Sequence, residues 1–366
     1  MENENYIVIR GKRFHHIWLR DHCLCPKCYH SDSSQKIYDT SQHTLPPKPI
    51  SVDETDTEVR IVWQEDPVHE SSYSIDWLLK HAYDPAPQAA NPNIVKLWKQ
   101  DTIQEHHPKQ FDAASDTDRA WIKQLLTSGF AIINNLEAEQ LHPWLSKNIG
   151  PLHISEYGLT SRIKPRKGAA AKDLGLSAAG HALSPHTDGS YRFGERLVQF
   201  LYVHENTTIG GETILVDGFC VAQDFMKNEP EAFKVLSNTP IGFQHVDHET
   251  GYLFRHTIPI LLAGHSGDMQ AIYYSAKNNN WRLPFDQVEE FYAAYRLFSG
   301  YINDDAYHHR FRLEPGNCLL IQNFRVLHAR DEYDPSSGRR DLETGYLDWS
   351  FVAGRQAYEQ LKGPLN

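Results

Sequence analysis

The stretch Ser184–Gly189, which reads Ser-Pro-His-Thr-Asp-Gly, has an imidazole and a carboxylate two positions apart. On an extended chain such side chains point to the same side, so His186 and Asp188 face a common point. A second histidine, His328, lies inside the apolar run Val326–Ala329, where an ionisable ring is costly without a partner. Two histidines and one carboxylate leave metal positions open, as in non-haem Fe(II) oxygenases. In a chain with 21 histidines, this pattern also fits buried rings that are only hydrogen-bonded.

Short apolar runs separated by Gly, Pro and Asn surround these two motifs, and many short strands at such spacing predict a two-sheet sandwich or jelly roll. We expect the chain to be mainly β with helical inserts. The expected strands are 130–134, 197–203, 213–216, 241–246, 258–262, 271–275, 318–322 and 326–329, and the expected helices are 117–127, 138–147, 220–227, 231–236 and 287–299.

A proline-rich connection divides the chain of 366 residues. Residues 84–93 contain three prolines among Ala, Gln and Asn, which favours an extended linker. Before it, strands at 6–10 and 58–63 and a helix at 74–81 predict a small β-rich module. We therefore expect an N-terminal domain at 1–90 and a larger catalytic domain at 91–366.

The charge balance and the apolar pattern limit the possible partners. The net charge of −11 disfavours a broad nucleic-acid surface. No apolar run reaches about 18 residues, and the N-terminus lacks the apolar core of a signal peptide. We expect a cytoplasmic protein that acts on a small molecule and O₂ and binds neither nucleic acid nor membrane. The sequence does not decide whether the protein forms a homodimer.

The five cysteines fit a metal cluster in a reducing compartment better than a disulfide framework, because their number is odd and three lie close together. Thiols at Cys23, Cys25 and Cys28 suit a structural Zn²⁺ that needs one more nitrogen or sulfur ligand. The spacing alone also fits three free, reduced cysteines that bind no metal. Cys220 and Cys318 lie in apolar stretches and are expected in the core.

An arginine pair follows His328 at Arg339 and Arg340. A planar guanidinium is a natural partner for the far end of a dicarboxylate. The hydroxyl of Thr213, in the sequence Gly-Gly-Glu-Thr, is placed to share that carboxylate.

These motifs together resemble the taurine dioxygenase-like enzymes: His-Thr-Asp, then Gly-Gly-Glu-Thr, then Leu-His and a later arginine. The segments 216–219, 323–328 and 340–346 resemble counterparts in the gamma-butyrobetaine and trimethyllysine dioxygenases, and the resemblance covers nearly the whole chain. It implies a double-stranded β-helix, iron on His186, Asp188 and His328, and 2-oxoglutarate on Arg340 with help from Thr213. Arg339 is the competing choice.

The resemblance extends to the cysteine cluster, because Ile17–His22 is similar to the start of the zinc domain of gamma-butyrobetaine dioxygenase. In that family the fourth zinc ligand is a histidine shortly before Asp-Trp-Leu, which implies His69 rather than His22 or His30. With four protein ligands, the zinc would be structural.

The family binds a trimethylammonium group in an aromatic cage, where cation–π attraction replaces hydrogen bonds. Tyr157 and Tyr346 match two cage positions. Ser161 and Ala178 stand where other aromatic residues are expected, so Tyr191 is a candidate replacement, although packing alone would also explain a tyrosine there.

A basic cluster at Arg162, Lys164, Arg166 and Lys167 either faces solvent or clamps an anionic substrate end. The sequence thus leaves a carboxylate or a phosphonate betaine as substrate. The alternatives are a hydroxylase of a macromolecule and a catalytically silent, zinc-stabilised binding module.

Overall fold

The computed structural model describes residues 5–42, 46–84, 95–103, 110–114, 119–165, 180–194, 196–248, 250–264, 268–277 and 279–360. The chain forms two compact units, residues 1–92 with 359–366 and residues 93–358. The expected linker falls mostly on residues 85–94, outside the described residues. About a quarter of the described residues lie in α-helices. Within the described ranges, no helix is long and apolar enough to cross a bilayer.

The N-terminal unit is built on an antiparallel sheet in the order β5-β6-β7. Side chains of β6 alternate between solvent and a core formed by Val59, Ile61 and Trp63, as period-two patterning requires. Ser74 caps the helix after β7 by accepting from the Trp77 N–H, so the expected helix is present. Its elements are β1 (Tyr6–Ile9), β2 (Lys12–His15), α1 (His16–Asp21), β3 (Tyr29–His30), β4 (Gln35–Lys36), β5 (Pro49–Glu54), β6 (Glu58–Trp63), β7 (His69–Ser74) and α2 (Ile75–Lys80).

The larger sheet of the second unit has the order β10-β22-β13-β20-β9-β8, and β11 also pairs with β22. Its pairs are antiparallel except β8 with β9. The strands are β8 (Gln110–Asp112), β9 (Phe130–Asn134), β10 (Leu152–His153), β11 (Thr160–Ile163), β13 (Leu197–Asn206), β20 (Cys318–Gln322) and β22 (Arg340–Asp348).

The smaller sheet has the order β12-β21-β14-β19, formed by β12 (Leu183–His186), β14 (Thr213–Asp217), β19 (His308–Phe311) and β21 (Val326–Arg330). Leu215 and Val326 of this sheet share a core with Leu201 and Ile321 of the larger sheet. The alternate side chains of the larger sheet, among them Phe200, face a second core under the helices α4 (Ala120–Ser128) and α5 (Leu141–Asn148). The strands are thus buried on both sides, which explains their continuous apolar sequences.

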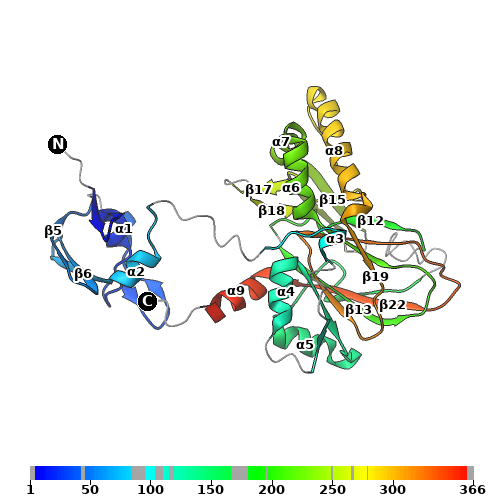
Figure 1. Ribbon diagram of the computed structural model, residues 1–366, viewed down its shortest axis with the longest axis horizontal. Helices are drawn as coiled ribbons and strands as arrows, with labels where there is room; N and C mark the ends of the chain where they lie inside the picture. Colours follow the sequence, from blue (N-terminus) through cyan, green and yellow to red (C-terminus); the bar gives the residue numbers. More distant parts are fainter. Residues whose placement is uncertain are drawn as a thin grey trace. The chain divides into compact units, whose positions relative to one another are not determined.

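A third core lies among α6 (Gly218–Asn228), α7 (Pro230–Asn238), α8 (Val288–Ile302) and two hairpins, β15–β16 and β17–β18. Figure 1 shows these helices together, away from α4 and α5. The hairpin strands are β15 (Ile241–Asp247), β16 (Tyr252–Ile258), β17 (Leu261–Ala263) and β18 (Met269–Ile272), and the remaining helices are α3 (Gln100–Ile103) and α9 (Trp349–Gln360).

One expected strand, 258–262, is wrong as a single element. The chain leaves β16 at Ile258 and begins β17 at Leu261. Pro259 lies between them, and proline has no N–H to donate to a strand ladder. The expected strand 271–275 also ends early, at Ile272.

Candidate functional site

The smaller sheet places His186 directly opposite His328, because β12 and β21 pair in that register. The two rings lie 4.3 Å apart between centroids. Asp188 follows in the turn after β12, with Oδ1 3.4 Å from His186 Nε2 and Oδ2 3.7 Å from His328 Nε2. One ligand atom from each residue lies within 4.8 Å of the other two. The sequence motifs are therefore brought to one point.

Neighbouring groups hold these three side chains in the form that a metal needs. His186 Nδ1 donates to the Ser184 carbonyl at 2.8 Å, which leaves the Nε2 lone pair facing the cluster. Burial lowers the pKa of His328 to about 3, and the adjacent His186 adds to this, so His328 is neutral at physiological pH. Burial alone would raise the pKa of Asp188, but His328 and His186 hold it well below its usual range.

The Asp188 carboxylate also accepts two hydrogen bonds that sequence reasoning did not anticipate. Gln199 Nε2 and the Tyr346 hydroxyl each donate to Oδ2 at 2.8 Å. Asn323 fixes the backbone of Asp188 by accepting from its N–H and donating to its carbonyl, both at 2.8 Å. The carboxylate is therefore oriented by residues from three different strands or loops.

A cavity of about 350 Å³ opens onto the three residues. Of the residues proposed from the sequence, Tyr157, Tyr191, Tyr346, Thr213 and Arg340 line it. Three further lining residues, His245, Lys277 and Arg330, were not predicted from the sequence.

Aromatic rings form one wall of this cavity. The His245 ring stacks on Tyr191 with centroids 4.8 Å apart and lies 6.0 Å from Tyr157. The Tyr191 hydroxyl donates to Glu156, whose carboxylate also pairs with Arg192. Ser161 lines the cavity without a ring, and Ala178 lies outside the described residues. His245 thus adds a ring to this wall that was not predicted from the sequence.

Arginine side chains form another part of the cavity lining. Arg340 is buried, its Nη1 donates to Asn206 Oδ1 at 3.1 Å, and among the described residues it has no carboxylate partner. Burial and the charge of Arg330 lower the pKa of Arg340 to about 10. Thr213 lies beside Arg330 in the β14–β21 pairing. Arg339, by contrast, has 81% of its side chain exposed, so the cavity contains Arg340.

Arg162 does not line the cavity. It lies on β11 between Ser161 and Ile163, which do, and side chains alternate between the two faces of a strand. Arg162 pairs with Asp341 and lies 3.7 Å from Glu343, and Lys164 also pairs with Asp341. This geometry removes Arg162 from the substrate residues, because carboxylates of β22 already neutralise it. Arg166 and Lys167 lie outside the described residues.

Lys277 is, with Arg330, one of two lining cations that sequence reasoning missed. Its Nζ donates to His186 Nε2 at 3.0 Å. Burial lowers the pKa of Lys277, while the Asp188 carboxylate opposes this.

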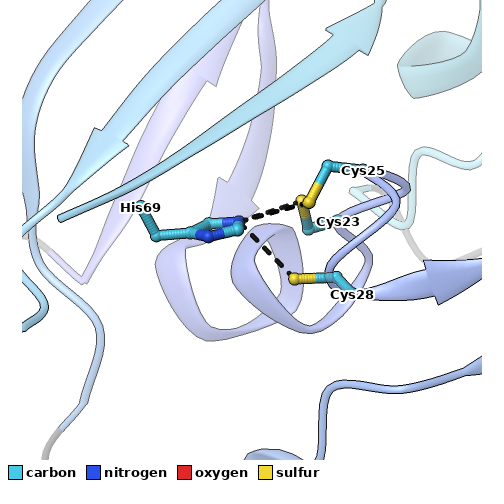
Figure 2. Close-up of side chains that lie close together, drawn as sticks. All are labelled: Cys23, Cys25, Cys28 and His69. Carbon is cyan, nitrogen blue, oxygen red and sulfur yellow. Dashed lines mark hydrogen bonds between the residues drawn. The ribbon is translucent and has the colours of Figure 1, made fainter. Parts of the chain in front are cut away.

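The N-terminal unit contains a separate cluster, shown in Figure 2. His69 Nε2 lies 3.3 Å from Cys23 Sγ, 3.7 Å from Cys25 Sγ and 3.5 Å from Cys28 Sγ. The histidines that the sequence left as alternatives lie elsewhere. His22 stacks on Trp18, and His30 contacts Ser33.

Cys220 and Cys318 are buried in apolar cores, as expected.

Comparison with known proteins supports a common origin over almost the full length. Residues 94–346 match the taurine catabolism dioxygenase TauD, TfdA family, and residues 9–79 match the gamma-butyrobetaine hydroxylase-like N-terminal family. The gamma-butyrobetaine dioxygenase of Pseudomonas sp. (strain AK-1) is 29% identical over 93% of this chain and 88% of its own length. The mitochondrial trimethyllysine dioxygenase of Homo sapiens is 28% identical over 92% of this chain and 80% of its own.

Among solved structures, AAD-2 in complex with Mn(II) and N-oxalylglycine superposes with a TM-score of 0.51 at 12% identity, covering 65% of this chain and 92% of that one. At 12% identity this likeness concerns the fold alone.

Proposed function

The chain belongs to the taurine catabolism dioxygenase TauD, TfdA family, and from this premise we propose that it hydroxylates a small zwitterion with a quaternary ammonium at one end and an acid at the other. It is an iron- and 2-oxoglutarate-dependent dioxygenase. One observation carries the substrate proposal: a single cavity joins the His186, Asp188 and His328 cluster to an aromatic wall and to a buried arginine without a carboxylate partner in the described residues.

Iron is proposed to bind His186, Asp188 and His328. Neutral imidazoles and an ionised carboxylate are the donor set that Fe(II) takes in such enzymes, and the cavity lies on the open side of the cluster. With 2-oxoglutarate and O₂, the bound iron supplies the oxidation that replaces C–H by C–OH and yields succinate and CO₂. The protein's own part is to orient Asp188 through Gln199 and Tyr346 and to exclude water around the substrate.

The distal carboxylate of 2-oxoglutarate is proposed to bind Arg340, with Thr213 beside it. A buried guanidinium whose pKa is lowered gains most from an incoming carboxylate, because the anion replaces the hydration that burial removed. We propose that the facing sheets around this site form the double-stranded β-helix of the catalytic domain, residues 91–366.

The quaternary ammonium is proposed to lie against Tyr157, Tyr191, His245 and Tyr346. Aromatic faces attract a cation that has no N–H to donate. Gamma-butyrobetaine and trimethyllysine, which the relatives' names give as their substrates, both carry such a group.

Zinc is proposed to bind Cys23, Cys25, Cys28 and His69 and to stabilise the N-terminal domain, residues 1–90. The four donor atoms surround one point, and Cys₃His is a common set for structural zinc.

The first prediction tests the substrate class. Succinate formation should rise with gamma-butyrobetaine or its trimethylammonium phosphonate counterparts. The matched control is the tert-butyl analogue, which has the same shape without the positive charge. Each lost cation–π contact is worth roughly 0.5–2 kcal/mol, so its kcat/KM should fall about tenfold or more. If only uncharged compounds or a protein substrate released succinate, the zwitterion proposal would be wrong and the iron proposal would stand.

The second prediction concerns iron. His328→Ala should abolish turnover and lower Fe(II) binding while the protein stays folded, because one ligand of an open site is lost. His181→Ala, an exposed histidine just before β12, is the matched control and should behave as wild type. Equilibrium dialysis and circular dichroism provide the measurements. Full activity of His328→Ala would contradict the assignment.

The third prediction separates the two arginines. Arg340→Met should raise the KM for 2-oxoglutarate about 30-fold or more, since removing a buried charged partner costs on the order of 2–5 kcal/mol. Arg339→Met, at an exposed position, should change it less than about threefold. Steady-state kinetics with varied 2-oxoglutarate decides, and the reverse order of effects would exchange the two roles.

The fourth prediction concerns zinc. Metal analysis should find about one tightly held zinc per chain, and Cys25→Ser should lose it together with thermal stability. Cys220→Ala changes a thiol outside the cluster and should keep the zinc. A Cys25→Ser protein with full zinc content and normal melting would refute the site.

A further inference from the structure

Lys277 reaches the cavity from a segment that is held against the metal-ligand turn. The Thr187 N–H donates to the Tyr274 carbonyl at 2.8 Å, and the Tyr274 N–H donates to Thr187 Oγ1 at 3.0 Å. The Tyr274 hydroxyl bonds Ser299 on α8 at 2.9 Å. Because Lys277 comes only three positions after Tyr274, these contacts fix its backbone close to His186 and Asp188.

Among the residues that the structure describes, the ammonium of Lys277 has no carboxylate partner. Its hydrogen bond goes to His186 Nε2, and nowhere in the described ranges does a carboxylate lie within ion-pair distance of it. The Nε2 lone pair is the one that the proposed iron site requires, so metal binding and this hydrogen bond exclude each other. A cation inside a cavity is unfavourable unless an anion or hydrogen-bond acceptors satisfy it.

Arg340 also lines the cavity, but it is already proposed to bind the distal carboxylate of 2-oxoglutarate. The two described members of the basic cluster, Arg162 and Lys164, are already engaged, since both pair with Asp341 on the other face of the sheet. The substrate acid therefore has no partner on β11, whereas Lys277 lies within the same cavity as the aromatic wall.

We propose that Lys277 binds the acidic group of the substrate and so sets the specificity for a zwitterion. This inference rests on the function proposed above. With the quaternary ammonium on the aromatic wall and the acid on Lys277, the carbons between them would lie in the cavity that His186, Asp188 and His328 also line. A compact ammonium accepts either a carboxylate or a phosphonate, because its charge imposes no planar geometry.

The test compares Lys277→Met and Lys277→Arg with the wild-type enzyme loaded with iron and 2-oxoglutarate. The substrates are a carboxylate betaine, a phosphonate betaine and a trimethylammonium alcohol of matched length. Lys277→Met should raise the KM for the preferred acid about 30-fold or more and change the KM for the alcohol less than about threefold. Lys277→Arg should recover part of the loss. The acid that wild type takes with the lower KM identifies the anion.

A second readout separates substrate binding from cosubstrate binding. The visible absorption of the anaerobic Fe(II)–2-oxoglutarate complex gives the 2-oxoglutarate affinity, which Lys277→Met should leave unchanged. The matched control Lys234→Met removes an exposed lysine of α7 and should alter neither measurement.

Three results would overturn the inference. The first is an equal loss with acid and alcohol. The second is a weakened 2-oxoglutarate complex, which would place Lys277 on the cosubstrate. The third is an unchanged KM for the acid. Should wild type respond to none of the zwitterions, the proposed function itself would fail, which is a different outcome from a normal wild type with an insensitive Lys277→Met.

Discussion

The buried ion pair between Arg325 and Asp217 anchors the sheet that positions the site. Both side chains are fully buried, so the pair is stable only if hydrogen bonds satisfy every remaining group. Arg325 donates to both Asp217 oxygens and to the carbonyls of Lys96 and Thr127, and Asp217 also accepts from the Trp98 N–H. Asp217 ends β14 and Arg325 immediately precedes β21, so the pair fixes the strand register that presents His328 to the cavity. Removing either partner would leave a buried charge next to that strand.

The same strand geometry sorts the charges on β11 and β22. In their pairing, Ser161 faces Thr344 and Ile163 faces Leu342, and all four line the cavity. The intervening pair, Arg162 with Glu343, lies on the opposite face, where Glu343 also contacts His142 and His204. The alternation of side chains along these strands thus keeps the Arg162 ion pairs out of the cavity. The cations that line the cavity are Arg340, at the start of β22, and Arg330 and Lys277 from other elements.

Site residues could be predicted from the sequence only where a short motif marks them. The His-x-Asp spacing and the downstream strand located His186, Asp188 and His328, and resemblance located His69, because each is tied to a short motif. Arg162 was misplaced because a cluster of basic residues in sequence says nothing about which face of a strand each one occupies. His245 and Lys277 carried no signal, since β15 and the loop after β18 approach the cavity only through tertiary packing.

The aromatic wall also explains how the cavity would discriminate against an ordinary ammonium. A primary amine needs hydrogen-bond acceptors to replace its lost water, whereas a quaternary ammonium needs only polarisable surface. The Glu156 carboxylate behind Tyr191 is buried and already bonded to Tyr191 and Arg192, so it has little capacity to accept a hydrogen bond from an incoming N–H. Because the Glu156–Arg192 pair is neutral overall and sits behind the rings, it holds Tyr191 in place without supplying an ion pair to the substrate. Selectivity for a methylated nitrogen would then have two causes. The aromatic rings attract the cation, and the Glu156 carboxylate is already occupied and cannot accept from an N–H of a competing amine.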